Sequence, residues 1–580
     1  MKRTLSISLF VLLFILLSAL PALAQTPEAT ASTTATASVA DTPLDWIPAD
    51  FDGFVRIDLS DPANSLTDMN VGLFVAAILQ PARTRYTQRQ TFDNFFPLDS
   101  FDVENFTFTN NVLPWLKDEF IVAYKTLNTS FAVDANDAVL ILPTTNALAA
   151  SDALAAVIKG QDFPKQENYR NVIVYQGDHT AFAVTPSAVL AGPVDLLHET
   201  IDTMLGSSPS LTASPVYQQV RAALPPNNLI FGYLGKNASA HALGALLSSG
   251  GSAQPFLTAL TQSLDAIDNA KTPDRLLLSG AVDGVAVGVD YDQFQTSYAK
   301  AHVILHTSDT PEPTDATFDS SVLNLIPRSA MLVQSGTDAS TTATEALYSL
   351  PYLNFAGKAF SAFPISPSAA GTILTAPSAD QIETVVNSFL TTVKPVVDVQ
   401  SDLIDKIKGS YALALIPRPN DPLPVLDTPF DLLLVVKTDS ADTAQAVQAS
   451  AAKLLATFTA PLQSEQVESQ TFQTLSAPDS SDPVVRIGAV GNMVVIGTGS
   501  AVQLALQAQQ GDDRLTNQAR WKNLSQNDQI PYVYVDVNAI YNTFLPTAGG
   551  PTTRPISQLG IQSRYLGNSL FALDVTAMLP

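Results

Sequence analysis

One order of elements occurs in both halves of this chain and limits the folds that it can adopt. In residues 180–234, an apolar strand ends at Gly192 and is followed by a helical pattern that stops near Gly206. In residues 493–537, a similar strand ends at Gly497, and a helix, a glycine, an aromatic residue and a second strand follow in the same order. A unit that recurs along a chain in this way indicates an internal duplication.

The flanking sequence extends this correspondence. Ile47-Pro48 and Ile326-Pro327 each precede an apolar strand. A strand at 138–142 with a helix at 147–158 corresponds to a strand at 432–437 with a helix at 441–457. Strands joined by short turns pair antiparallel, and helices inserted between them cover the sheet. The predicted fold class is therefore α+β, with two tandem, internally duplicated units, each a mainly antiparallel sheet packed with helices.

Four segments are predicted along the chain. Residues 1–24 have the positive start, apolar core and Ala22-Leu23-Ala24 exit of a signal peptide, which predicts a secreted or extracytoplasmic protein. The alternative is an uncleaved N-terminal membrane anchor. Residues 25–42 are rich in Thr, Ala and Ser and predict a flexible tether. The two α+β units are assigned to 43–310 and 311–580, divided at a polar, proline-containing stretch.

Composition excludes several classes of function. The net charge of -24 disfavours binding to nucleic acids and to anionic lipid surfaces. The absence of cysteine excludes disulfides, thiolate catalysis and cysteine-based metal sites. The hydrophobic fraction of 46% with 14% charged residues is typical of a chain with packed cores.

The histidines offer no clear metal site. His302 and His306 fall in one predicted strand, where their even spacing puts them on one face but about 13 Å apart. That separation is too large for one metal ion. His179 follows Asp178 at a predicted hairpin turn, where aspartate is common. The five histidines of the chain are His179, His198, His241, His302 and His306.

Ser500 lies where a strand passes into a helix, as the nucleophile of a serine hydrolase does. The Gly-x-Ser-x-Gly spacing is absent around it, and no histidine follows His306 in the sequence. We therefore expect Ser500 to be a helix N-cap. The glycines that recur between the two halves are interpreted as strand ends and helix C-caps rather than as a phosphate-binding loop. They are Gly192, Gly206, Gly497 and Gly511.

Two acidic stretches, Asp134-Ala135-Asn136-Asp137 and Asp512-Asp513, carry oxygen ligands that suit calcium. Neither has the ligand spacing of a calcium loop, and both are interpreted as turns. Residues 92–108 are rich in phenylalanine, which favours a core contact, with an apolar binding surface as the alternative. No catalytic, cofactor-binding or metal-binding residue is therefore assigned, and no cofactor is expected.

Several segments resemble a family of uncharacterised secreted bacterial proteins, domain of unknown function 3352. They include Ile47-Pro48-Ala49-Asp50 before one strand and Val112-Leu113-Pro114-Trp115-Leu116-Lys117-Asp118-Glu119 before another. The likeness continues from Tyr175 through Gly192 to Leu211. Lys117 departs from the glycine expected there, whereas Gly409 fills the corresponding place in the second half. The resemblance implies an exported protein of the cell envelope or surface and implies no activity.

Three functions remain open. The first is a non-enzymatic binding or structural protein of the bacterial cell envelope or surface, and this is the one we expect. The second is a carrier or sensor of an apolar small ligand, which residues 92–108 motivate. The third is a hydrolase that uses carboxylates, which the many acidic residues permit. The expected partners are a protein, an envelope component or an apolar small molecule, and membrane contact is expected only through an uncleaved N-terminal segment.

Overall fold

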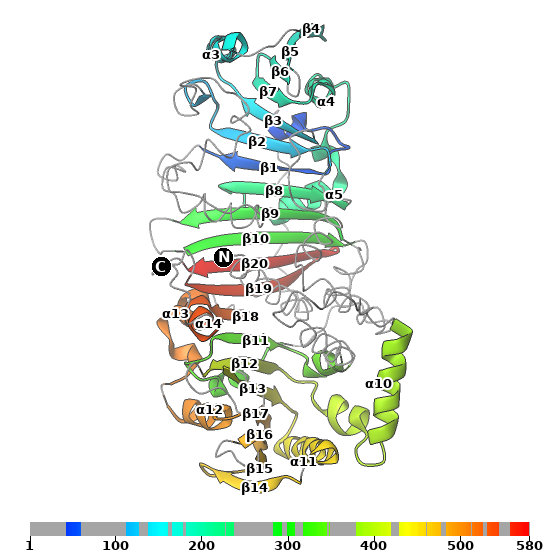
Figure 1. Ribbon diagram of the computed structural model, residues 1–580, viewed down its shortest axis with the longest axis vertical. Helices are drawn as coiled ribbons and strands as arrows, with labels where there is room; N and C mark the ends of the chain where they lie inside the picture. The colour runs from blue at the N-terminus through cyan, green and yellow to red at the C-terminus, as the bar shows by residue number, and fades with distance from the viewer. Residues whose placement is uncertain are drawn as a thin grey trace, which may run out of the picture.

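Figure 1 shows the computed structural model of the chain. It describes residues 42–59, 112–126, 137–160, 165–177, 181–226, 228–236, 282–292, 298–307, 317–344, 347, 379–418, 429–459, 461–476, 483–511, 513–525, 531–544 and 557–578. Several predictions lie outside these residues: the signal peptide, all but the last residue of the tether, the phenylalanine-rich stretch, His179, His241, Asp134 and Asp512.

The described strands form one 20-stranded sheet in which every neighbouring pair is antiparallel (Figure 1). From one edge to the other, the strands are β4 (Lys165–Tyr169), β5 (Val172–Gln176), β6 (Ala181–Val184), β7 (Ala188–Gly192), β3 (Ala138–Pro143), β2 (Glu119–Tyr124), β1 (Gly53–Asp58), β8 (Ile230–Gly235), β9 (Val282–Asp292), β10 (Tyr298–Thr307), β20 (Leu570–Met578), β19 (Gln558–Gly567), β18 (Val533–Asp536), β11 (Leu332–Gly336), β12 (Tyr411–Pro417), β13 (Phe430–Lys437), β17 (Met493–Gly497), β16 (Pro483–Val490), β15 (Gln470–Ser476) and β14 (Gln463–Val467).

This strand order reads the same from both edges. From one edge the order is β4, β5, β6, β7, β3, β2, β1, β8, β9, β10, and from the other edge it is β14, β15, β16, β17, β13, β12, β11, β18, β19, β20. Strands β10 and β20 pair with each other in the middle of the sheet. The residues that lie opposite one another in neighbouring strands also correspond between the two halves. In β1, β8, β9 and β10 these residues are Phe54, Tyr233, Ala286 and Ile304, and in β11, β18, β19 and β20 they are Val333, Tyr534, Gly560 and Thr576. By this register, His302 and Asp574 occupy corresponding positions, and they are paired with each other across the centre.

Helices pack on both faces of the sheet. On one face, α4 (Val194–Met204) and α5 (Pro215–Ala223) cover a core around Phe54 and Phe231, and α12 (Ala501–Gln510) and α13 (Ala519–Leu524) cover a core around Tyr534. On the other face lie α3 (Ala147–Gly160), α11 (Ala441–Phe458) and α14 (Val537–Phe544). Strand residues alternate between these cores, because successive side chains point to opposite faces.

Shorter helical segments and one long helix complete the described chain. The long helix is α10 (Ala379–Val393), which stands beside the sheet next to α11 (Figure 1). The short segments are η2 (Pro43–Trp46), η7 (Leu211–Ala213), η9 (Ser320–Leu325), η10 (Val399–Leu403), η11 (Ile404–Lys406) and η12 (Leu515–Asn517). Within the described residues, no helix has the length and apolar character needed to cross a membrane.

The α+β class and the antiparallel sheet are confirmed. Most predicted strands and helices occur near their expected positions, including α3 and α12. The expectation of a separate sheet in each unit is wrong, because β10 and β20 pair along nine residues and join the strands into one sheet. The polar strands β4, β14 and β15 were not predicted, because their sequences lack an alternating apolar face. The predicted strand at 531–537 is shorter and leads into helix α14.

Candidate functional site

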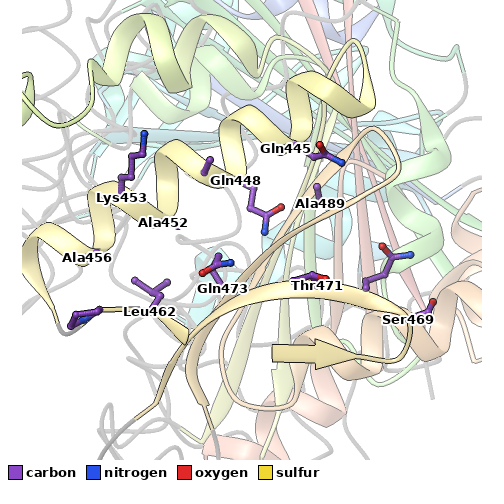
Figure 2. Close-up of a pocket in the computed structure, with 13 residues that line it drawn as sticks. Gln445, Gln448, Ala452, Lys453, Ala456, Leu462, Ser469, Thr471, Gln473 and Ala489 are labelled. Carbon is purple, nitrogen blue, oxygen red and sulfur yellow. The ribbon is translucent and has the colours of Figure 1, made fainter. Parts of the chain in front are cut away.

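A groove of about 750 Å³ lies at the β14 end of the sheet, between helix α11 and the strands β15 and β16 (Figure 2). Helix α11 forms one wall, and the β14–β15 hairpin forms the other. The lining residues are Gln445, Gln448, Ala449, Ala452, Lys453, Ala456, Pro461, Leu462, Ser469, Gln470, Thr471, Gln473 and Ala489. This volume falls within the usual range for small-ligand sites.

The sequence of α11 produces the helical wall. Ser440 caps the helix by accepting a hydrogen bond from the backbone N–H of Thr443 at 3.1 Å. Ala444 and Val447 are buried against Val494 of β17, which fixes the helix on the sheet. On the adjoining face of α11, the residues that line the groove follow one another at intervals of three or four positions, as residues on one helix face do. They are Gln445, Gln448, Ala449, Ala452, Lys453 and Ala456. This face therefore presents amides and small side chains to the open space.

The strand wall depends on Phe472, whose ring is fully buried in the core on the opposite face. Because strand residues alternate, burial of Phe472 turns Thr471 and Gln473 toward the groove, as Figure 2 shows. Gly488 pairs with Phe472, and a Cβ at this position would overlap the ring. The glycine therefore makes room for the aromatic anchor of the hairpin.

Hydrogen bonds hold the polar side chains of this wall. The Gln473 side-chain amide donates to the Ser464 hydroxyl at 3.0 Å, and the Gln466 amide donates to the Thr471 hydroxyl at 2.7 Å. On the helical wall, the Gln448 amide donates to the backbone carbonyl of Ile487 at 3.4 Å. These contacts fix the orientation of the Gln448 and Gln473 side chains.

An ion pair on the far face stabilises the same hairpin. Arg486 of β16 donates to both carboxylate oxygens of Glu465 in β14, at 2.8 and 3.0 Å. The Thr474 hydroxyl also donates to Glu465, at 2.8 Å. The hydrogen bonds from Arg486 lower the pKa of Glu465. The two-point contact links β14 to β16 across β15, and it lies outside the groove.

The lining of the groove is nearly neutral. Lys453 is the one charged residue among those that line it, and no carboxylate or histidine is among them. Glutamine amides, a serine and a threonine can both donate and accept hydrogen bonds. The described lining can therefore bind an uncharged polar ligand by hydrogen bonds, and it offers no acid–base pair for catalysis.

A group of three titratable side chains lies at the centre of the sheet. His302 contacts Asp574 through Nδ1 at 2.6 Å and Asp290 through Nε2 at 3.4 Å. Asn228 donates to the other oxygen of Asp290 at 2.9 Å. Hydrogen bonds to Asp290 and Asp574 raise the pKa of His302 to about 9. The imidazolium therefore balances two carboxylates between β9, β10 and β20.

The other described histidines lie apart from one another. His306 shares the strand and the face of His302, as predicted, and its Nδ1 lies 3.8 Å from Asp283. Burial lowers the pKa of His306. His198 stacks on the ring of Tyr169 with 3.8 Å between ring centroids. Among the described residues, no group of three histidine, aspartate or glutamate side chains has the geometry to bind a metal ion.

Ser500 occupies the N-cap position of α12, as predicted, but its side chain does not cap the helix. Its hydroxyl donates to Asp431 at 2.9 Å, and its backbone N–H donates to the same carboxylate at 3.0 Å. Asp431 is fully buried and also contacts Arg418 at 3.4 Å. The elbow between β17 and α12 is therefore part of a buried polar network, which the sequence pattern alone did not indicate.

The recurring glycines lie where they were expected. Gly192 and Gly497 end β7 and β17, and Gly206 and Gly511 follow α4 and α12. Gly206 has a φ of 70°, which glycine adopts without strain.

Sequence reasoning missed the groove. The available signal was a row of glutamines and alanines on one side of a helix, followed by a glutamine-rich hairpin, Gln466, Gln470 and Gln473 among them. Neither feature alone indicates a site. Only the packing of the helix beside the hairpin brings these side chains to one space.

Comparisons with known proteins identify a family for most of the chain. The model of a family described as "Protein of unknown function (DUF3352)" matches residues 77–578. A search of curated proteins finds no match.

Two solved structures of TP0453 show weak likeness. Crystal form III has 8% identity and a TM-score of 0.25, with 50% of this chain and 86% of that chain covered. Crystal form I has 7% identity and a TM-score of 0.24, with 50% and 90% covered. Likeness this weak carries no inference about function. The family match spans most of the sequence and agrees with the resemblance noted above, and the chain therefore belongs to the DUF3352 family of proteins of unknown function.

Proposed function

We propose that the protein is an exported, non-enzymatic protein of the bacterial cell envelope or surface that binds an uncharged polar ligand in the groove beside α11. The observation that carries the proposal is the lining of this open groove of about 750 Å³, where amides and hydroxyls predominate and Lys453 is the one charge. A site of this kind recognises a ligand through hydrogen bonds.

The placement of titratable groups supports a non-enzymatic role. The close pairs described above lie in the sheet, where each carboxylate is held by a histidine or an arginine. Such contacts stabilise strand pairing, whereas a hydrolase that uses carboxylates needs two of them facing a substrate. The export of the chain is supported by the N-terminal sequence, with its positive start, apolar core and Ala22-Leu23-Ala24.

We also propose that the two halves of the sheet arose by internal duplication. The support is the matching order of β1 to β10 and β11 to β20, together with the common register of the rows through Tyr233 and Tyr534. The groove has diverged between the halves. The hairpin β4–β5 carries Ile173 and Tyr175 at alternate positions, where β15 carries Thr471 and Gln473.

The test of the proposed function is retention of the purified chain on envelope material from the cells that produce it. Ala449→Trp fills the groove from an exposed position of α11, and Ala446→Trp places the same side chain on α11 outside the lining. We expect the parent chain and Ala446→Trp to be retained and Ala449→Trp to be released. Equal retention of both variants would refute a role of the groove, and release of cleaved products would refute the non-enzymatic role.

Sequencing the N-terminus of the exported chain tests cleavage before Gln25.

A further inference from the structure

We propose that the ligand of this groove is an extended polypeptide segment with small, uncharged side chains, such as Ala, Ser and Thr. This inference rests on the proposed function and names the class of ligand for the same site. It follows from the length of the groove, the chemistry of its walls and the size of the residues along the helix.

The groove has the length of a short extended peptide. Its helical wall runs from Gln445 to Ala456, a rise of about 16 Å along α11. Figure 2 shows the strand wall following the helix, with Ser469 near one end and Leu462 near the other. A polypeptide in the extended conformation covers this distance with about five residues.

The walls suit peptide groups. Each peptide unit offers one N–H donor and one carbonyl acceptor, and a glutamine amide can bond to both at once. Gln445 and Gln448 line the helical wall, and Gln470 and Gln473 line the strand wall, where Gln473 alternates with the buried Phe472. Amides on both walls can therefore satisfy the two edges of one extended backbone, which would otherwise lose its hydrogen bonds to water.

The helical wall favours small side chains. Ala449, Ala452 and Ala456 alternate with the longer residues along the groove, and Ala489 lies across from them. These methyl groups leave room for alanine, serine or threonine and offer no deep pocket for a large aromatic residue. The net charge of -24 repels a strongly acidic peptide, and Lys453, the one cation of the lining, offsets only one of its negative charges.

The lining fits a saccharide less well. Sugar rings present an apolar face that packs on aromatic rings, and carboxylates commonly accept bonds from their hydroxyls. None of the described residues that line the groove is aromatic or acidic. We therefore take an oligosaccharide as the competing outcome of the experiment.

The experiment is a fluorescence-anisotropy titration of the full chain with a labelled hexapeptide, Thr-Ala-Ser-Thr-Ala-Ser, blocked at both ends. We expect saturable binding, and we expect Gln445→Ala and Gln473→Ala each to weaken it roughly five- to tenfold through the loss of a hydrogen-bonding amide. Ala449→Trp should abolish binding, and Ala446→Trp should leave it unchanged. A hexapeptide with Asp in place of Ser should bind at least roughly tenfold more weakly.

Absence of saturable binding, or equal affinity for the Asp-containing peptide, would overturn the proposed ligand class. Binding of an N-acetylglucosamine tetramer that Ala449→Trp abolishes, with no peptide binding, would assign the groove to saccharides. In that case envelope retention would still depend on Ala449 and the proposed function would stand. If retention is also insensitive to Ala449→Trp, the proposed function fails together with the ligand class.

Discussion

His302 is held by groups from two neighbouring strands. Its imidazole lies between Asp290 of β9 and Asp574 of β20, and hydrogen bonds to them raise its pKa to about 9. Lys300, also on β10, is paired with Asp290 of β9 and with Thr576 of β20. The folded state therefore binds a proton near pH 7 that an unfolded histidine, with a pKa near 6.5, holds weakly.

We predict that Asp574→Asn lowers the pKa of His302, because it removes the carboxylate at 2.6 Å from Nδ1. The raised pKa contributes stability that is complete below about pH 6.5 and is lost as the pH rises through about 9. The variant should therefore lose about 1–2 kcal/mol of unfolding free energy at pH 6 and much less at pH 10.

NMR titration of the His302 ring and urea unfolding at the two pH values measure both effects. Asp283→Asn is the matched control, because that carboxylate lies near His306 instead, and it should leave the His302 pKa in place. An unchanged His302 pKa in Asp574→Asn would contradict the assigned contact.

Phe472 is the aromatic residue that anchors the β14–β15 hairpin in the core of the sheet. Phe472 is fully buried, and Gly488 on the neighbouring strand provides the space for its ring. The polar residues of the hairpin face the groove or the solvent, which also protects the edge strand β14 from pairing with other chains.

We predict that Gly488→Ala destabilises the protein by about 1–3 kcal/mol, because the new methyl group overlaps the Phe472 ring. Guanidinium unfolding of the variant measures the loss. Gly511→Ala serves as the control, because a Cβ at Gly511 meets only the Gln507 carbonyl at 3.9 Å. The double variant Gly488→Ala/Phe472→Leu should recover part of the loss. Equal unfolding free energies of Gly488→Ala and Gly511→Ala would contradict the packing of Gly488 against Phe472.

The elements that the sequence predicts are those with a periodic apolar pattern. The core strand at 138–142 and the helix at 147–158 fall close to β3 and α3, because burial on one or both faces dictates their residues. The edge strands β4 and β14 bury few side chains, and their polar sequences resemble loops. The predicted strand at 531–537 includes the first residue of helix α14, because its apolar residues run into the helix without a turn signal.

The candidate site could not be predicted for a different reason. Gln445 and Gln473 belong to separate elements, and ordinary surface glutamines have the same sequence signature. Their convergence depends on the angle at which α11 crosses the sheet and on the twist of the edge hairpin, which are properties of tertiary packing. His302 was recognised as a strand residue, but its pairing with Asp574 depends on the register between two distant strands.

At the scale of the whole molecule, pairing of β10 with β20 determines the architecture. Nine residue pairs join the two strands, from Tyr298 opposite Met578 to His306 opposite Leu570. The strands thus form one sheet with two polar edges rather than two sheets, and the groove lies at one end of it (Figure 1).

We predict that Lys300→Cys combined with Thr576→Cys forms an intramolecular disulfide on mild oxidation. The two residues are directly opposite in the register, where Cβ atoms lie about 5 Å apart. The natural chain contains no cysteine, so the product is unambiguous in peptide mass spectrometry. Lys300→Cys with Leu570→Cys is the control, because these positions are about 20 Å apart along the strands and should stay reduced. A chain that stays reduced at positions 300 and 576, or a disulfide between positions 300 and 570, would contradict the pairing of β10 with β20.

A ligand that occupies the groove shields the groove from solvent, and a single introduced cysteine measures this shielding. Ala449→Cys places a thiol in the lining, whereas Ala446→Cys places one on α11 outside it. Maleimide labelling of each variant is timed with and without the envelope material that retains the chain. We predict that this material slows labelling at position 449 several-fold and leaves position 446 unaffected. Equal labelling rates at position 449 in the two conditions would show that the retained chain carries no ligand in the groove.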